Sequence, residues 1–118
     1  MEKLFILKQD FQDRNLNPKD QLYYCPHCAM IEGVLSYYPH LREKLEVIYI
    51  NFPRPRHQLM DLVGEENQGC PNLVISKDIS DKVDTGYFKM HGDYLFVNQK
   101  ELIAQYLADR FKIAIPHP

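Results

Sequence analysis

The Cys-Pro-His-Cys motif from Cys25 to Cys28 constrains the fold of this chain more than any other feature. It lies where a polar segment changes into a helical pattern of apolar residues. Two cysteines three positions apart at the start of a helix are close enough to form a disulfide. The unpaired backbone N–H groups and the positive end of the helix dipole favour a thiolate on Cys25, whereas Cys28 lies one turn further in. The motif therefore predicts a redox-active pair in which Cys25 attacks and Cys28 resolves.

The apolar pattern around this motif predicts an α/β fold. Short apolar runs are typical of buried strands, and spacings of three and four residues indicate helices. The segment 9–22 is rich in turn-forming residues and predicts a long surface loop beside the motif. Asn98 and Glu101 resemble a capping box at the start of the last helix. We expect strands at residues 3–7, 46–51, 73–75 and 94–97, and helices at 25–38, 59–63 and from 99 onward.

Length and cysteine content limit the possible functions. A chain of 118 residues can form a single domain over 1–118 that buries roughly two thirds of its unfolded surface. Three cysteines are too few for a disulfide scaffold, and an odd number cannot all pair within one chain. Redox chemistry and metal binding are the two explanations that remain.

Charge and hydropathy suggest neither nucleic acid nor a membrane as a partner. The net charge is −2, and acidic and basic residues are mixed along the chain. The apolar run 4–7 is broken at Lys8, and it is too short for a signal peptide or a membrane span. We therefore expect a cytoplasmic protein.

The expected order β-α-β-α-β-β-α, with Cys-x-x-Cys opening the first helix and Pro71 preceding the third strand, resembles the thioredoxin and glutaredoxin fold. That resemblance implies a three-layer α/β/α sandwich with a central mixed sheet of four strands. The motif Cys-Pro-His-Cys is similar to the active-site motif of DsbA-type thiol oxidases. The longer strings 24–36, 52–56 and 64–68 resemble an uncharacterised bacterial thioredoxin-like family of unknown function.

The resemblance also implies roles for single residues. Cys25 would be the nucleophile and Cys28 the resolving thiol, with Pro26 between them. Pro71 would be a cis proline that faces the pair, and the backbone of Cys70 would bind an extended substrate. Tyr24 replaces the tryptophan that precedes the motif in thioredoxins, and Lys8 matches a lysine with which glutaredoxins hold a carboxylate.

The implied partners are a protein or small-molecule disulfide as substrate and glutathione or a reductase as reductant. No bound cofactor is implied. Two alternatives stay open. One is a zinc, copper or iron–sulfur site formed by Cys25, Cys28 and Cys70, with or without His27, and the other is a catalytically silent interaction module.

Four side chains near the motif have more than one interpretation. His27 either pairs with the Cys25 thiolate or is an exposed loop imidazole. Cys70 is a buried small residue, a redox partner of Cys25 or a third metal ligand. For Arg54 and Arg56 the sequence favours a solvated loop over binding of a substrate carboxylate.

Overall fold

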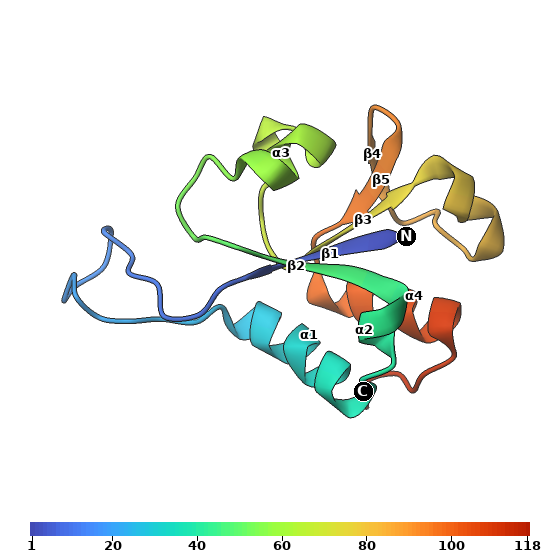
Figure 1. The fold of residues 1–118 in the computed structure, drawn as a ribbon, viewed down its shortest axis with the longest axis horizontal. Coiled ribbons are helices and arrows are strands. Elements are labelled where there is room, and N and C mark those ends of the chain that lie inside the picture. Colours follow the sequence, from blue (N-terminus) through green and yellow to red (C-terminus); the bar gives the residue numbers. More distant parts are fainter.

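The protein, in a computed structural model, is an α/β fold built on one mixed sheet of five strands in the order β2-β1-β3-β5-β4 (Figure 1). The structure describes residues 1–118, except for the side chains of 80–82. Strand β1 is parallel to β2 and antiparallel to β3, and β5 is antiparallel to both β3 and β4. The strands are β1 (Glu2–Leu7), β2 (Leu45–Ile50), β3 (Asn72–Ser76), β4 (Lys89–His91) and β5 (Tyr94–Val97).

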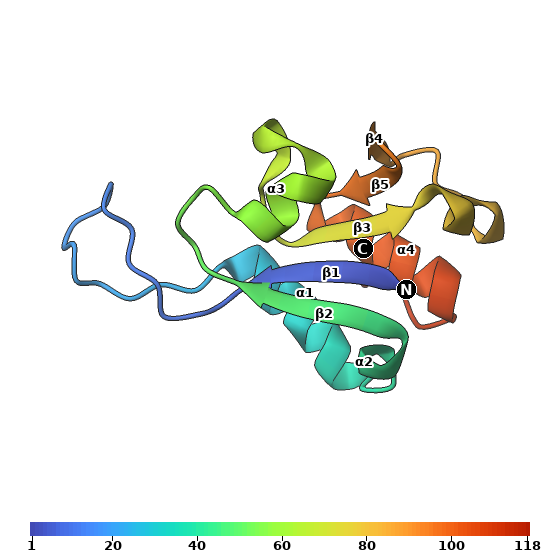
Figure 2. The ribbon, with the colours of Figure 1, turned by 45° about the horizontal axis from the view of Figure 1, so that its top comes forward.

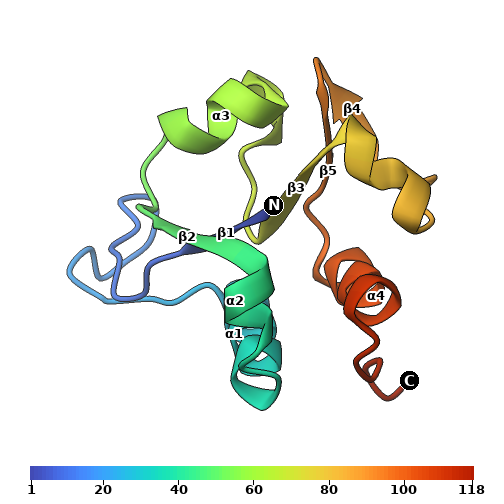
Figure 3. The same cartoon turned by 45° about the vertical axis from the view of Figure 1, so that its right-hand side comes forward.

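The helices cover both faces of the sheet. Figures 1 and 3 show α1 and α4 on one face and α3 on the other, so the elements form three layers. The helices are α1 (Pro26–Tyr37), α2 (Leu41–Lys44), α3 (His57–Val63) and α4 (Lys100–Phe111), with 3₁₀ helices η1 (Glu65–Asn67) and η2 (Lys77–Lys82).

The core follows from the apolar runs of the inner strands. Leu4, Phe5 and Ile6 of β1 are buried, as are Leu73 and Ile75 of β3, because layers of helix cover both faces of these strands. The end of β1 and the start of α1 are joined by the long segment 8–25, which extends away from the sheet in Figure 2. The pair of cysteines therefore lies at one edge of the packed core, beside this loop.

Two details of the sequence prediction are wrong. The sheet has five strands and not four, because Lys89–His91 pairs with β5 across a turn at Gly92, where φ is +57°. All three residues of β4 are exposed, so no apolar pattern marks this strand. Helix α4 begins at Lys100 with Gln99 as its N-cap, not Asn98, and the Asn98 amide lies near Gly69.

Within the part of the chain that the structure describes, every helix is too short or too polar to cross a membrane.

Candidate active site

Cys25 is the N-cap of α1. Its backbone is extended, with φ −77° and ψ 115°, and its Sγ accepts a hydrogen bond of 3.2 Å from the backbone N–H of Cys28. Pro26 follows at the first helical position, where its missing N–H leaves no donor unused and its fixed φ suits a helix. The sulfur of Cys25 thus occupies the place where a helix N-terminus stabilises negative charge.

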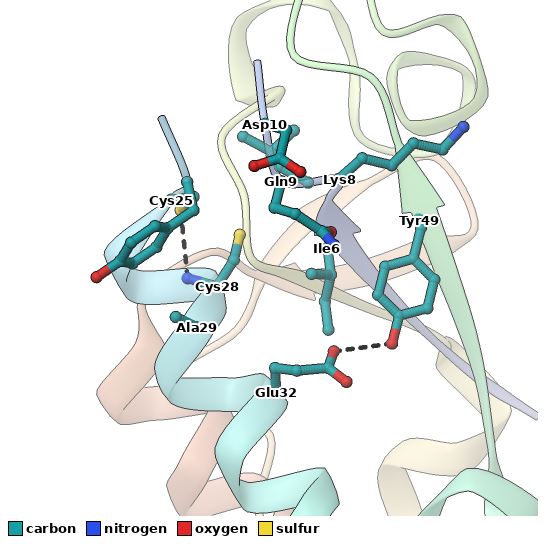
Figure 4. Close-up of a pocket in the computed structure, with 11 residues that line it drawn as sticks. Ile6, Lys8, Gln9, Asp10, Cys25, Cys28, Ala29, Glu32 and Tyr49 are labelled. Carbon is teal, nitrogen blue, oxygen red and sulfur yellow. Dashed lines mark hydrogen bonds between the residues drawn. The ribbon is translucent and has the colours of Figure 1, made fainter. Parts of the chain in front are cut away.

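Cys28 lies behind Cys25 and is buried, with 3% of its surface exposed. Burial raises the pKa of its thiol strongly, and a backbone hydrogen bond from Leu7 opposes this only in part. Figure 4 shows its sulfur directed toward the end of β1. Cys25 is partly exposed, and all three cysteines are free thiols. The predicted difference in access between Cys25 and Cys28 is confirmed.

The loop before β3 brings Cys70 and Pro71 against Cys25. The Sγ of Cys25 donates to the carbonyl oxygen of Cys70 at 3.8 Å, a distance acceptable for a sulfur donor. The Cys70–Pro71 peptide bond is cis, as the resemblance implies. Pro71 is buried and Cys70 is partly buried, so the backbone of Cys70 forms a wall beside the exposed thiol.

The Cys70 thiol itself points to another acceptor. Its Sγ donates to the carbonyl oxygen of Gln68 at 3.9 Å. Burial raises the pKa of Cys70 to about 11, and the positive charge of Arg56 acts in the opposite direction. Three thiols therefore share one end of the sheet, each in a different environment.

Arg56 is buried beside Cys70, with 8% of its surface exposed, so the expectation of a solvated arginine at this position is wrong. Its guanidinium donates twice to the Phe52 carbonyl, at 2.9 and 2.7 Å, and once to the Gln68 carbonyl at 2.7 Å. Its backbone N–H donates to the side chain of Gln68 at 2.6 Å. Among the described residues it has no carboxylate partner. Arg54, in contrast, is exposed.

A hollow of about 600 Å³ opens beside the two motif cysteines (Figure 4). The residues around it come from the end of β1, the loop that follows, the start of α1, and β2. They are Ile6, Leu7, Lys8, Gln9, Asp10, Tyr24, Cys25, Cys28, Ala29, Glu32 and Tyr49.

Three further predicted site residues lie around the motif cysteines. Lys8 lines the hollow, but in Figure 4 its side chain extends away from both cysteines. Tyr24 is 66% exposed and lies on the rim. His27 is exposed and lies within electrostatic reach of Glu101 in α4, and no hydrogen bond among the described residues joins it to Cys25.

The far end of the hollow is a polar network that sequence reasoning missed. The hydroxyl of Tyr49 donates to Glu32 at 2.8 Å, and Arg42 donates to the Tyr49 hydroxyl at 3.0 Å. Arg42 also forms an ion pair with Glu32. Glu32 lies four positions after Cys28, on the same face of α1, which is the one signal in the sequence that could have indicated it.

Among the described residues, no group of three or more His, Cys, Asp or Glu side chains is placed to hold a metal ion.

A comparison with protein-family models gives a match over most of the chain. The model of a family described as "Protein of unknown function (DUF3088)" matches residues 1–115. Neither the search of curated proteins nor the search of solved structures found a match.

Proposed function

The chain belongs to the DUF3088 family of proteins of unknown function, and from the geometry of its own site we propose that it is a thiol–disulfide oxidoreductase with a thioredoxin-like fold. The observation that carries the proposal is the pair of environments at the start of α1. Cys25 is accessible and its sulfur accepts a backbone hydrogen bond, while Cys28 is buried directly behind it. An accessible, stabilised thiol backed by a shielded one suits attack followed by resolution.

The arrangement of elements supports the proposed fold. Without β4 and the short helices α2, η1 and η2, the order of elements is β1, α1, β2, α3, β3, β5, α4. Strands β1 and β2 are parallel and joined through α1, whereas β3 and β5 are antiparallel. Pro71 follows a cis peptide bond at the start of β3 and faces the start of α1 through Cys70.

The proposed cycle transfers two electrons. The Cys25 thiolate attacks one sulfur of a substrate disulfide, a new S–S bond forms, and one substrate thiolate leaves. Cys28 then gives up its proton and attacks the Sγ of Cys25, which releases the second substrate thiol and leaves a Cys25–Cys28 disulfide. Because burial raises the pKa of Cys28 and shields its sulfur, external disulfides react at Cys25.

The substrate is a protein or small-molecule disulfide, and glutathione or a reductase restores the dithiol. An extended substrate would lie along the backbone of Cys70 and Pro71, in the manner of an added strand. Lys8 and Tyr24, on the rim of the hollow, would contact the parts of the substrate outside the disulfide. We place this cycle in the cytoplasm and without a bound cofactor.

The test is alkylation mass spectrometry on metal-analysed protein equilibrated across a series of glutathione redox buffers. We expect a single two-electron transition that converts Cys25 and Cys28 from alkylated thiols to a disulfide. If the three thiols resist alkylation until a chelator is added and one metal is present per chain, the protein is a metal-binding protein instead. Thiols that stay reduced and metal-free across the series would indicate a silent interaction module.

A further inference from the structure

We propose that Cys70 is a second resolving thiol, which displaces substrate from Cys25 by forming a Cys25–Cys70 disulfide beside the buried guanidinium of Arg56. The inference rests on the proposed function, because Cys25 must first carry a mixed disulfide. Attack by Cys70 would release the substrate from Cys25 without the use of Cys28. Three observations support it: the position of Cys70, the charge beside it, and the hydrogen bond that its thiol makes.

The position of Cys70 puts it within reach of Cys25. The Sγ of Cys25 already contacts the Cys70 carbonyl oxygen at 3.8 Å. The Cys70 sulfur belongs to the same residue as that oxygen, and one rotation about its Cα–Cβ bond changes the direction in which it points. Cys28 approaches Cys25 from within α1, whereas Cys70 approaches from the loop before β3. The two thiols therefore reach Cys25 from different elements.

The charge beside Cys70 offsets part of the cost that burial imposes on a thiolate there. A buried cation is costly unless an anion or several acceptors surround it, and Arg56 has only the neutral carbonyls of Phe52 and Gln68 among its described hydrogen-bond acceptors. Among the ionisable groups, Cys70 interacts most strongly with this guanidinium. Ionisation of Cys70 would supply the missing negative charge inside the protein.

One carbonyl oxygen links the two side chains. The oxygen of Gln68 accepts from Arg56 at 2.7 Å and from the Cys70 thiol at 3.9 Å. The thiol and the guanidinium therefore meet at a shared acceptor. Phe52 holds Arg56 in place. Its ring centroid lies 5.5 Å from the guanidinium carbon, and its carbonyl oxygen accepts hydrogen bonds from the guanidinium. When the Cys70 proton leaves, the guanidinium is already positioned next to the thiolate.

The chemistry balances without a further oxidant. In the mixed disulfide, Cys25 is bonded to a substrate sulfur. The Cys70 thiolate attacks the Sγ of Cys25, the Cys25–Cys70 bond forms, and the substrate leaves as a thiolate. The substrate disulfide is reduced by two electrons, which come from the two cysteines. Cys28 can later attack the same Cys25 sulfur, which restores the Cys70 thiol and gives the Cys25–Cys28 disulfide.

The experiment uses the full chain carrying Cys28→Ser, treated with a chelator and one equivalent of 2,2′-dithiodipyridine. We expect two molecules of pyridine-2-thione per chain, which take up the two thiol protons, and a protein mass lower by two hydrogens. Peptide mapping should find Cys25 linked to Cys70. The double variant Cys28→Ser/Cys70→Ser should release one thione and keep the other on Cys25. If the Cys28→Ser chain also stops at a stable Cys25 adduct with an alkylatable Cys70, the inference is wrong.

Arg56 is tested as a positioning residue in the Cys28→Ser background. We expect Arg56→Met to slow release of the second thione by about tenfold, the effect of about one pKa unit on the thiolate. Arg56→Lys should recover part of that rate because it keeps the charge. Arg14→Met, which removes an exposed cation from the loop, is the matched control. Equal second-phase rates for Arg56→Met and Arg14→Met would exclude the role of Arg56, and the cross-link in the Cys28→Ser chain still decides the role of Cys70.

The two proposals fail in different ways. Absence of a Cys25–Cys28 disulfide in the wild-type chain at every buffer potential would overturn the proposed function. A normal Cys25–Cys28 transition, together with a persistent Cys25 adduct in the Cys28→Ser chain, would overturn only the role of Cys70.

Discussion

Phe11 stacks face to face on Phe52, with ring centroids 4.3 Å apart and ring planes within 5° of parallel. Phe11 belongs to the loop between β1 and α1, and Phe52 belongs to the loop that holds Arg56. An isolated antiparallel β-bridge between Phe11 and Tyr23 closes the segment 12–22 of the first of these loops. The stacked pair therefore fastens the loop beside the hollow to the loop beside Cys70.

Phe11→Ala should release the segment 9–22 from Phe52. The change removes a stacked aromatic pair, which typically contributes about 0.5–1.5 kcal/mol beyond area burial, and we expect a loss of about 1 kcal/mol in the free energy of unfolding. Hydrogen exchange should accelerate in that segment and leave the central strands protected. Leu16→Ala, at an exposed apolar position in the same segment, is the control. Equal exchange in the two variants would mean that the stack does not hold the loop.

Cys25→Ser should abolish disulfide reduction, because it removes the one accessible thiol at the N-terminus of α1. With glutathione as reductant and a small aromatic disulfide as substrate, we expect the rate to fall to that of the uncatalysed reaction. Cys28→Ser should keep the first burst of thiol release, since that step uses Cys25 alone. A Cys25→Ser chain that turns over as fast as the wild type would show that the nucleophile lies elsewhere.

The sequence predicts the parts of this fold that have a local pattern. The helix that begins after Cys25 and the strand Tyr94–Val97 are present where apolar spacing and turn residues place them. The order of these elements, through the resemblance, also predicted the cis bond before Pro71. The chemistry at the start of α1 is local as well, because a helix N-terminus and two cysteines three apart suffice to define it.

The missed features depend on contacts that no apolar pattern in the sequence indicates. Strand β4 has no apolar pattern, and it forms because β5 offers a free edge for pairing. The Arg56 guanidinium is buried where the carbonyls of Phe52 and Gln68 both accept from it, and the sequence Pro53-Arg54-Pro55-Arg56 does not indicate this. The Lys8 side chain extends away from both cysteines, and no residue pattern around the end of β1 indicates this direction.

The stability of the reduced protein should fall as the pH rises above about 9. In the folded protein the pKa of Cys70 is raised from its ordinary 9.0 to about 11, and that of Cys28 is raised further by burial. Over that range the unfolded chain loses protons that the folded chain keeps, so unfolding becomes more favourable by about 1.4 kcal/mol for each unit of raised pKa.

Urea unfolding between pH 8 and pH 11 measures this effect under reducing conditions. Cys70→Ala should reduce the fall in the free energy of unfolding between pH 9 and pH 11. The variant lacks the Cys70 thiol proton, which the folded wild-type chain keeps and the unfolded chain loses. An identical slope in the wild type and in Cys70→Ala would mean that the Cys70 thiol is not shielded as described.

A buried pair, Glu2 and Arg110, joins the two ends of the chain. Glu2 in β1 is 2% exposed, and its Oε2 accepts from the Tyr106 hydroxyl at 2.8 Å and from Arg110 Nε at 2.9 Å. Glu2→Gln removes the negative charge and leaves the partly buried Arg110 without its partner. Removing one member of a buried pair costs about 3–5 kcal/mol, and since Arg110 is 28% exposed we expect a loss of about 2 kcal/mol.

Glu46→Gln is the matched control for Glu2→Gln, because it breaks the exposed Lys3–Glu46 pair on the neighbouring strand. An exposed pair contributes about 0–1 kcal/mol, so the control should change the free energy of unfolding by less than about 1 kcal/mol. Urea unfolding of both variants at neutral pH compares the two pairs directly. If the two variants lose equal stability, the Glu2 carboxylate is solvated in solution and β1 is not anchored to α4 through it.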